Sequence, residues 1–164
     1  MTTTTAAGLD VSAEPGTALI TTEKVINGPR DLVFRCYQDP ELVKQWMGPS
    51  RLTTTIDQWD FRHGGSWSFS QTDTDGSVYA FRGTFHGEPT PDQFVQTFEF
   101  LGFPGHVSLD TLHLVDQGDG TTLVQTISAF QSVEARDGML SSGMTSGMDE
   151  GYQRLEQIVA GLKG

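Results

Sequence analysis

The chain has 164 residues, a formal net charge of −11 and one cysteine, Cys36. Nucleic acids and anionic membranes are bound through clustered Lys and Arg, and this acidic chain has no such cluster, so we expect neither as a partner. One cysteine also excludes an internal disulfide and a zinc site built from cysteines.

Residues 1–16 have no hydrophobic periodicity and consist mostly of Thr, Ala, Gly and other small residues. We expect them to form a disordered N-terminal tail before a single domain over residues 17–164. The tail has neither the basic start nor the apolar run of a signal peptide, which predicts a cytoplasmic protein.

Residues 17–27 alternate well enough to predict a first strand. Gly28-Pro29 then predicts the beginning of a helix that ends near Gln38, because proline fits the first turn of a helix. Asp39 is a suitable N-cap for a second short helix that runs to about Trp46.

Six consecutive strands are predicted in the middle of the chain, separated by turns rich in Gly, Asp and Pro. Their expected ranges are 52–61, 66–72, 78–86, 93–101, 107–115 and 121–130. Short loops between consecutive strands indicate antiparallel pairing, so the protein is expected to be α+β.

Residues 138–164 are predicted to form one long amphipathic helix, with apolar residues recurring at spacings of three and four. Its first half carries Gly143, Gly147 and Gly151, and each glycine costs about 1 kcal/mol relative to alanine inside a helix. Two interpretations stay open. The glycines let the helix pack closely on its sheet, or together with the flexible Met144 and Met148 they leave room for a ligand.

A curved sheet wrapped on this helix would enclose a cavity, and aromatic residues share parity on three neighbouring strands. The candidate ligand-binding residues are Trp46, Trp59, Trp67, Phe69, Tyr79, Phe81, Phe85, Phe94, Gln96, Phe98, Phe100, His113, Gln125, Met144 and Met148. The alternative is an ordinary core rich in phenylalanine.

Among these candidates, Trp46 and Trp59 are expected at the entrance, and Gln96 and Gln125 are the polar side chains whose parity aims them inward. His113 is a base or a hydrogen-bonding group only if its ring points into the cavity. His113 alternates with Leu112 and Leu114, so it is expected on the opposite, outer face of the strand.

No catalytic set, metal site or cofactor is predicted. The four histidines lack the spacing of metal ligands on a helix, and no HExxH pattern occurs. Cys36 lies in the apolar stripe of its helix, where a thiol behaves as a small hydrophobic group.

Several short motifs in order, among them Asp39-Pro40-Glu41-Leu42, Gly64–Phe69, Phe81-Arg82-Gly83 and Gly147–Tyr152, resemble a known family. Over about residues 17–162 the chain resembles the activator-of-Hsp90-ATPase-homologue branch of the START-like (SRPBCC, Bet v 1-like) superfamily. The resemblance implies a helix-grip fold. In that fold a curved antiparallel sheet of about seven strands wraps a long C-terminal helix, and two short helices follow the first strand.

Members of that superfamily carry lipids, hormones or polyketides, cyclise aromatic polyketides or act as co-chaperones. The Gly147–Tyr152 segment and the loop 102–105 are also similar to actinomycete self-resistance proteins that intercept enediyne antibiotics. In those proteins a glycine backbone is sacrificed to the drug's diradical, which makes Gly102 and Gly105 candidate cleavage positions.

The leading hypothesis is a non-catalytic protein that binds a hydrophobic, aromatic or polycyclic small molecule such as a polyketide, for sequestration or antibiotic self-resistance. The alternatives are a polyketide aromatase or cyclase, and an interaction module resembling the Hsp90 co-chaperone. The expected partner is the small molecule alone, bound without a cofactor by a monomer or weak dimer.

Overall fold

The computed structural model describes residues 2–5 and 8–163; the expectation for the tail at residues 1, 6 and 7 lies outside the described residues. The strands are β1 (Thr2–Thr4), β2 (Asp10–Ser12), β3 (Leu19–Ile26), β4 (Thr53–Trp59), β5 (Ser66–Thr72), β6 (Val78–His86), β7 (Gln93–Phe100), β8 (Val107–Asp116) and β9 (Thr122–Ala129). The helices are α1 (Arg30–Gln38), α2 (Pro40–Trp46), α3 (Val133–Leu140) and α4 (Met144–Lys163).

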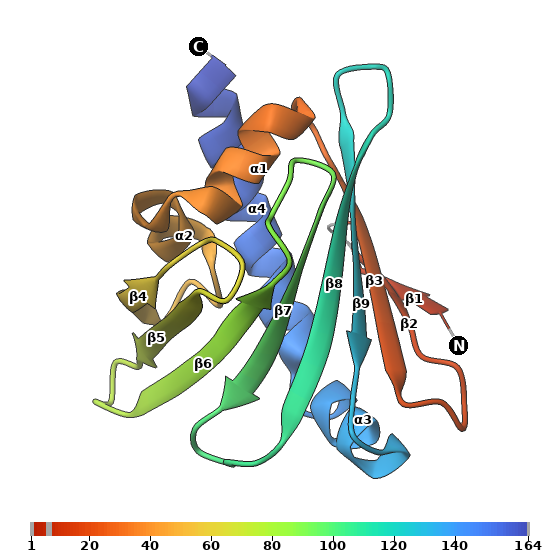
Figure 1. Cartoon of the computed structure of the whole chain (residues 1–164), viewed down its shortest axis with the longest axis vertical. Helices are drawn as coiled ribbons and strands as arrows, with labels where there is room; N and C mark the ends of the chain where they lie inside the picture. Colours follow the sequence, from red (N-terminus) through yellow and green to blue (C-terminus); the bar gives the residue numbers. More distant parts are fainter. Residues whose placement is uncertain (1, 6–7, 164) are drawn as a thin grey trace.

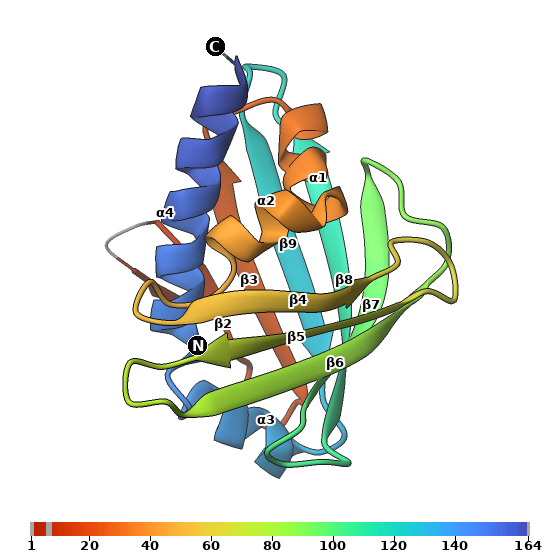
Figure 2. The ribbon, with the colours of Figure 1, turned by 90° about the vertical axis from the view of Figure 1, so that its left-hand side faces the viewer.

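In the part of the chain that the structure describes, nine strands form one sheet in the order β1-β2-β3-β9-β8-β7-β6-β5-β4. Every neighbouring pair is antiparallel. The sheet curls around α4, while α1 and α2 cover one end of the concave side and α3 lies at the other end (Figures 1 and 2). The predicted α+β, helix-grip arrangement is therefore confirmed.

The two short helices begin where their sequences predict. Pro29 is the N-cap residue of α1, and the Asp39 side chain accepts a hydrogen bond of 2.9 Å from the backbone N–H of Glu41 at the start of α2. This cap satisfies one of the N–H groups that a helix leaves without an internal partner.

The N-terminal segment differs from the disordered tail that we expected, and the sheet has nine strands instead of about seven. Leu9 is fully buried, Val11 is 7% exposed, and β2 pairs with β3 over three residues. Two apolar side chains at alternate positions are thus enough to attach this short segment to the sheet edge as a strand.

The C-terminal region is two helices instead of the single helix predicted from residue 138. Gly143 lies between α3 and α4 with φ +86°, a conformation that suits glycine and ends a helix. The Ser132 side chain caps α3, and the buried Arg136 of α3 donates hydrogen bonds of 3.0 and 3.1 Å to the carbonyls of Glu14 and Leu19.

Close packing explains Gly151 in the middle of α4. A Cβ placed on Gly151 would lie 2.8 Å from the Trp46 carbonyl oxygen, and one on Gly147 would touch Pro49 at 3.5 Å. Beside this contact, Arg154 donates hydrogen bonds to the carbonyls of Trp46 at 3.0 Å and of Gly48. Gly151 therefore lets α4 approach the end of α2, whereas a Cβ on Gly147 would make only an ordinary contact.

Replacing Gly151 with alanine should destabilise the protein, because the new Cβ must displace the backbone of Trp46. We expect a net loss of about 1 to 2 kcal/mol in the free energy of unfolding, after the gain in helix propensity is included. Chemical denaturation measures this change.

Gly161→Ala on the same helix is the matched control. It has no atom within 4 Å of the new Cβ and should gain up to about 1 kcal/mol; equal effects of the two variants would refute the packing role of Gly151.

Candidate functional site

A buried carboxyl group lies at the centre of the concave face of the sheet. Along β8, Ser108, Asp110, Leu112 and Leu114 are buried, whereas Leu109 and Val115 are exposed on the opposite face. This alternation places Asp110, which is 8% exposed, on the side that α4 covers.

Neutral polar side chains on both neighbouring strands surround Asp110. Gln96 of β7 and Ser128 of β9 are its direct partners in the ladder. Ser108 donates a hydrogen bond of 3.1 Å to Asp110 Oδ1, and Gln96 Nε2 lies 3.5 Å from Oδ2. Among the described residues, no cation forms an ion pair with Asp110.

Burial raises the pKa of Asp110, because removing a carboxylate from water disfavours its charged form. Hydrogen bonds from Ser128, Ser108 and Gln96 oppose this effect without cancelling it. A buried carboxyl without a cationic partner lowers the free energy of unfolding, so Asp110 does not stabilise the sheet.

A second polar group lies above the same face, between the helices and the sheet. The phenols of Tyr37 in α1 and Tyr152 in α4 are buried and interact, and burial raises the pKa of both; Thr126 of β9 also hydrogen-bonds Tyr152. Within the described part of the chain, Thr22 Oγ1, Tyr37 Oη and Trp67 Nε1 are buried without a well-aligned hydrogen-bond partner.

An aromatic wall borders this polar strip on the side of β5, β6 and β7. Trp67 stacks on Phe69 with a centroid distance of 5.4 Å and lies 5.8 Å from Phe98, which in turn lies 5.4 Å from Phe81. Phe100 extends the wall, 5.2 Å from Phe81 and 6.4 Å from Tyr79. Phe85, also buried, contacts Trp59 at 5.5 Å.

The two ends of the concave face differ in burial. Leu112, Leu114, Val124 and Phe94 are buried under α1 and the C-terminal half of α4. Toward α3, the inward-facing residues Gln96, Phe98, Thr126 and Ser128 are only half-buried, and so are Met144 and Met148 above them. Water therefore reaches the inner face at the end of the sheet where α4 begins.

Comparison with known proteins places this architecture in a family. The family model described as "Activator of Hsp90 ATPase homolog 1-like protein" matches residues 27–160. The chain belongs to this family. No curated protein gave a significant match.

Solved structures similar to this family member share its fold at low sequence identity. A protein from Arthrobacter aurescens is 22% identical with a TM-score of 0.83, covering 92% of this chain and 91% of that one. Protein Ms6760 from Mycobacterium smegmatis is 21% identical with a TM-score of 0.83 and 97% coverage of both chains. CalU16 from Micromonospora echinospora is 19% identical with a TM-score of 0.59, covering 98% of this chain and 71% of that one.

The described residues contain neither a candidate membrane-spanning helix nor a candidate metal-binding cluster. No helix there is long and apolar enough to cross a membrane. No group of three or more His, Cys, Asp or Glu side chains in those residues is arranged to hold a metal ion.

Several predicted site residues lie away from the concave space in this family member. Gln125 was expected to point inward, but it lies on the outer face opposite His113 and donates a hydrogen bond of 2.8 Å to Glu23. The reason is that Thr122 and Val124 occupy the inward parity of β9. Both Gln125 and His113 line a shallow outer hollow of about 420 Å³.

The two tryptophans expected at the entrance bind helix carbonyls instead. Trp46 is 6% exposed and its Nε1–H donates to the Cys36 carbonyl at 2.8 Å; Trp59 is half-buried and donates to the Tyr37 carbonyl at 2.9 Å. Phe94 packs with Tyr37 and Phe61, both at 5.2 Å, in the sealed part of the core. Burial raises the pKa of the Cys36 thiol to about 11, so it stays protonated near neutral pH.

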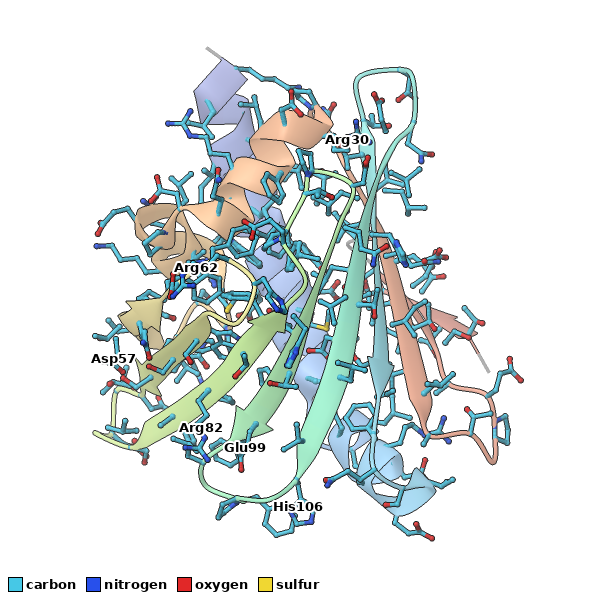
Figure 3. The ribbon with its side chains drawn as sticks, in the orientation of Figure 1. Arg30, Asp57, Arg62, Arg82, Glu99 and His106 are labelled. Atoms are coloured by element: carbon cyan, nitrogen blue, oxygen red, sulfur yellow. The ribbon has the colours of Figure 1, made fainter. Side chains whose placement is uncertain are left out.

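The outer face of the same sheet is polar where β6 and β7 meet. Arg82 donates a hydrogen bond of 2.9 Å to Glu99, and both lie beside the loop that carries His106 (Figure 3). The other oxygen of Glu99 accepts a hydrogen bond of 2.7 Å from the N–H of Gly105, so this glycine lies in an ordered, exposed turn.

Sequence analysis missed Asp110, Ser108, Ser128, Tyr37 and Tyr152. Asp110 was detectable, because it shares parity with Leu112 and Leu114, and a charged residue on an otherwise apolar strand face is a signal of function. The tyrosine pair was not detectable, since it depends on how two helices cross.

Asp110→Asn should make the protein more stable near pH 7. The folded-state pKa is raised, so the stability of the wild type is greatest below the pKa of the unfolded carboxyl and declines as the pH rises through the folded value. The variant removes this ionisation, and its advantage should shrink as the pH falls toward about 4. Unfolding curves of the wild type and the variant, measured between about pH 4 and 7, give this difference in stability.

Asp119→Asn is the control of opposite sign. Hydrogen bonds from Thr121 lower the pKa of Asp119, so its ionised form stabilises the hairpin above the unfolded pKa. This variant should lose stability near neutral pH. A loss of the same sign in Asp110→Asn would contradict the assignment of Asp110 as a destabilising group.

Proposed function

We propose that the protein binds a hydrophobic, aromatic or polycyclic small molecule of the polyketide type between the concave face of the sheet and α4. The observation that carries the proposal is the half-burial of inward-facing Gln96, Phe98, Thr126 and Ser128 beneath the start of α4. An apolar space with a few convergent polar groups is the usual form of a small-molecule site.

The walls of this space suit a flat, apolar ligand. Phe81, Phe98 and Phe100 supply aromatic surface on the sheet, at centroid distances that allow offset packing. Met144 and Met148 lie half-buried in the first turns of α4, and methionine adapts to ligands of different outline because its side chain is flexible.

Sequestration or antibiotic self-resistance is the role that we propose for this binding. It is supported by the resemblance of Gly147–Tyr152 and the loop 102–105 to enediyne self-resistance proteins. Gly105 lies in an exposed turn, where a diradical could reach its α-hydrogen. A cytoplasmic location and a monomeric or weakly dimeric state remain predictions.

A polyketide cyclase is the second candidate, favoured by the buried carboxyl of Asp110. A carboxyl whose pKa is raised by burial can exchange protons with a bound poly-β-ketone. Orientation by the aromatic wall would supply the rest of the catalysis. Turnover of such a substrate by the wild type and none by Asp110→Asn would establish this reaction.

Introducing a charge into the proposed cavity should weaken ligand binding without unfolding the protein. Met144 is the first residue of α4, so Met144→Glu places a carboxylate where the helix dipole favours it. Burying that charge against an apolar ligand should lower the affinity at least tenfold, which corresponds to about 1.4 kcal/mol. Titration followed by NMR with aromatic polyketides measures the affinity and the residues that respond.

Ser146→Glu supplies the matched control, because Ser146 is exposed in the same turn of α4. Its affinity should equal that of the wild type. In the wild type, amide signals of Gln96, Phe98 and Thr126 should move and those of His113 should not. If no compound in a broad panel of aromatic molecules shifts any of these three inner-face signals, the cavity is disproved.

A further inference from the structure

We propose that the Asp110 carboxylate is the anchor for a hydroxyl group of the bound ligand. The cavity would then select hydroxylated aromatic molecules over ethers and hydrocarbons of the same shape. This inference rests on the proposed function, because the anchor lies inside the proposed cavity.

The position of Asp110 fits an anchor. It lies between Gln96 and Ser128 in the ladder, and both of these neighbours are half-buried, so partly exposed polar side chains flank the buried carboxyl. Phe98 follows two residues after Gln96 on the same strand and places aromatic surface beside the carboxyl.

The carboxyl also has unused capacity to accept hydrogen bonds. A carboxylate can accept about four, and Asp110 receives one from Ser128 and, on Oδ1, one from Ser108 at 3.1 Å. On Oδ2 the Gln96 amide lies 3.5 Å away, at the outer limit for such a bond. A ligand O–H directed at Oδ2 would add a shorter hydrogen bond to an oxygen that Gln96 reaches only at this limit.

The rest of the concave face points to the same shortage of internal partners. Thr22 lies across from Thr126, and Thr22 Oγ1 is buried without a hydrogen-bond partner in the described residues. Buried polar atoms are normally paired, and a bound water, ion or ligand group is one explanation of an unpaired one in a native protein.

A hydroxyl is the donor that these surroundings favour over an ammonium group. An ammonium ion must lose its own hydration before it can pair with a buried carboxylate, and the groups around Asp110 are neutral hydroxyls, an amide and aromatic rings. A phenol or alcohol makes a charge-assisted hydrogen bond with the carboxylate at a smaller desolvation cost.

Two probes of the same ring system test the anchor: 2-naphthol, which can donate a hydrogen bond, and 2-methoxynaphthalene, which cannot. The wild type should bind 2-naphthol about 10- to 100-fold more tightly, the usual effect of a hydrogen bond to a charged group. Asp110→Asn should reduce this preference at least fivefold, because an amide oxygen is a weaker acceptor, and should leave the affinity for 2-methoxynaphthalene unchanged. Calorimetric titration gives both ratios.

Asp57→Asn is the matched control, since Asp57 is an exposed carboxylate on β4 that points away from the concave face (Figure 3). It should keep the preference of the wild type. A measurement on the wild type makes the test independent of whether Asp110→Asn folds. The side-chain amide signals of Gln96 should move further with 2-naphthol than with 2-methoxynaphthalene at equal occupancy.

Equal affinities of the wild type for the two probes would overturn the anchor while leaving the cavity intact, because both probes would still bind. Failure of both probes to bind or to move any inner-face signal would refute the proposed cavity itself. A preference for 1-naphthylmethylammonium over 2-naphthol that Asp110→Asn abolishes would assign the carboxylate to an amine and overturn the hydroxyl assignment.

Discussion

The close contact between α4 and the chain that follows α2 determines where the terminal helix lies, and the rest of the concave side depends on that position. Gly151 allows the helix backbone to reach the Trp46 carbonyl, and Arg154 binds the carbonyls at the end of α2 from the same helix. From this point, Leu155 and Val159 extend into the sealed core with no exposed surface. The residues before Gly151 extend over the other end of the sheet, where the inner face is polar and partly open.

This division gives one sheet two different tasks. The end under α1 contributes hydrophobic burial through Leu114, Val124 and Ile26, all nearly inaccessible to water. The end near α3 includes a carboxyl whose burial opposes folding. Proteins accept such local losses at sites whose use depends on them.

Local rules predicted most of the elements, because alternation marks the strands and Asp39 and Pro29 mark the two short helices. Strands β1 and β2 were not predicted, because Leu9 and Val11 are the only apolar residues that indicate them. Parity also failed to orient Gln125, since its strand carries apolar residues on both faces. The burial of Asp110 could be predicted from its parity with Leu112 and Leu114. The partly exposed end of the concave face could not, because it depends on the placement of α4.

The register of the sheet has a consequence for how the protein forms. Strand β3 pairs along its whole length with β9, so Ile26 meets Thr122 although most of the chain lies between them. Contacts of such large sequence separation slow folding, because a long loop must close before they can stabilise anything. During synthesis the sheet therefore stays incomplete until β9 has emerged, and α4, which follows β9 in the chain, can cover the concave face only after that.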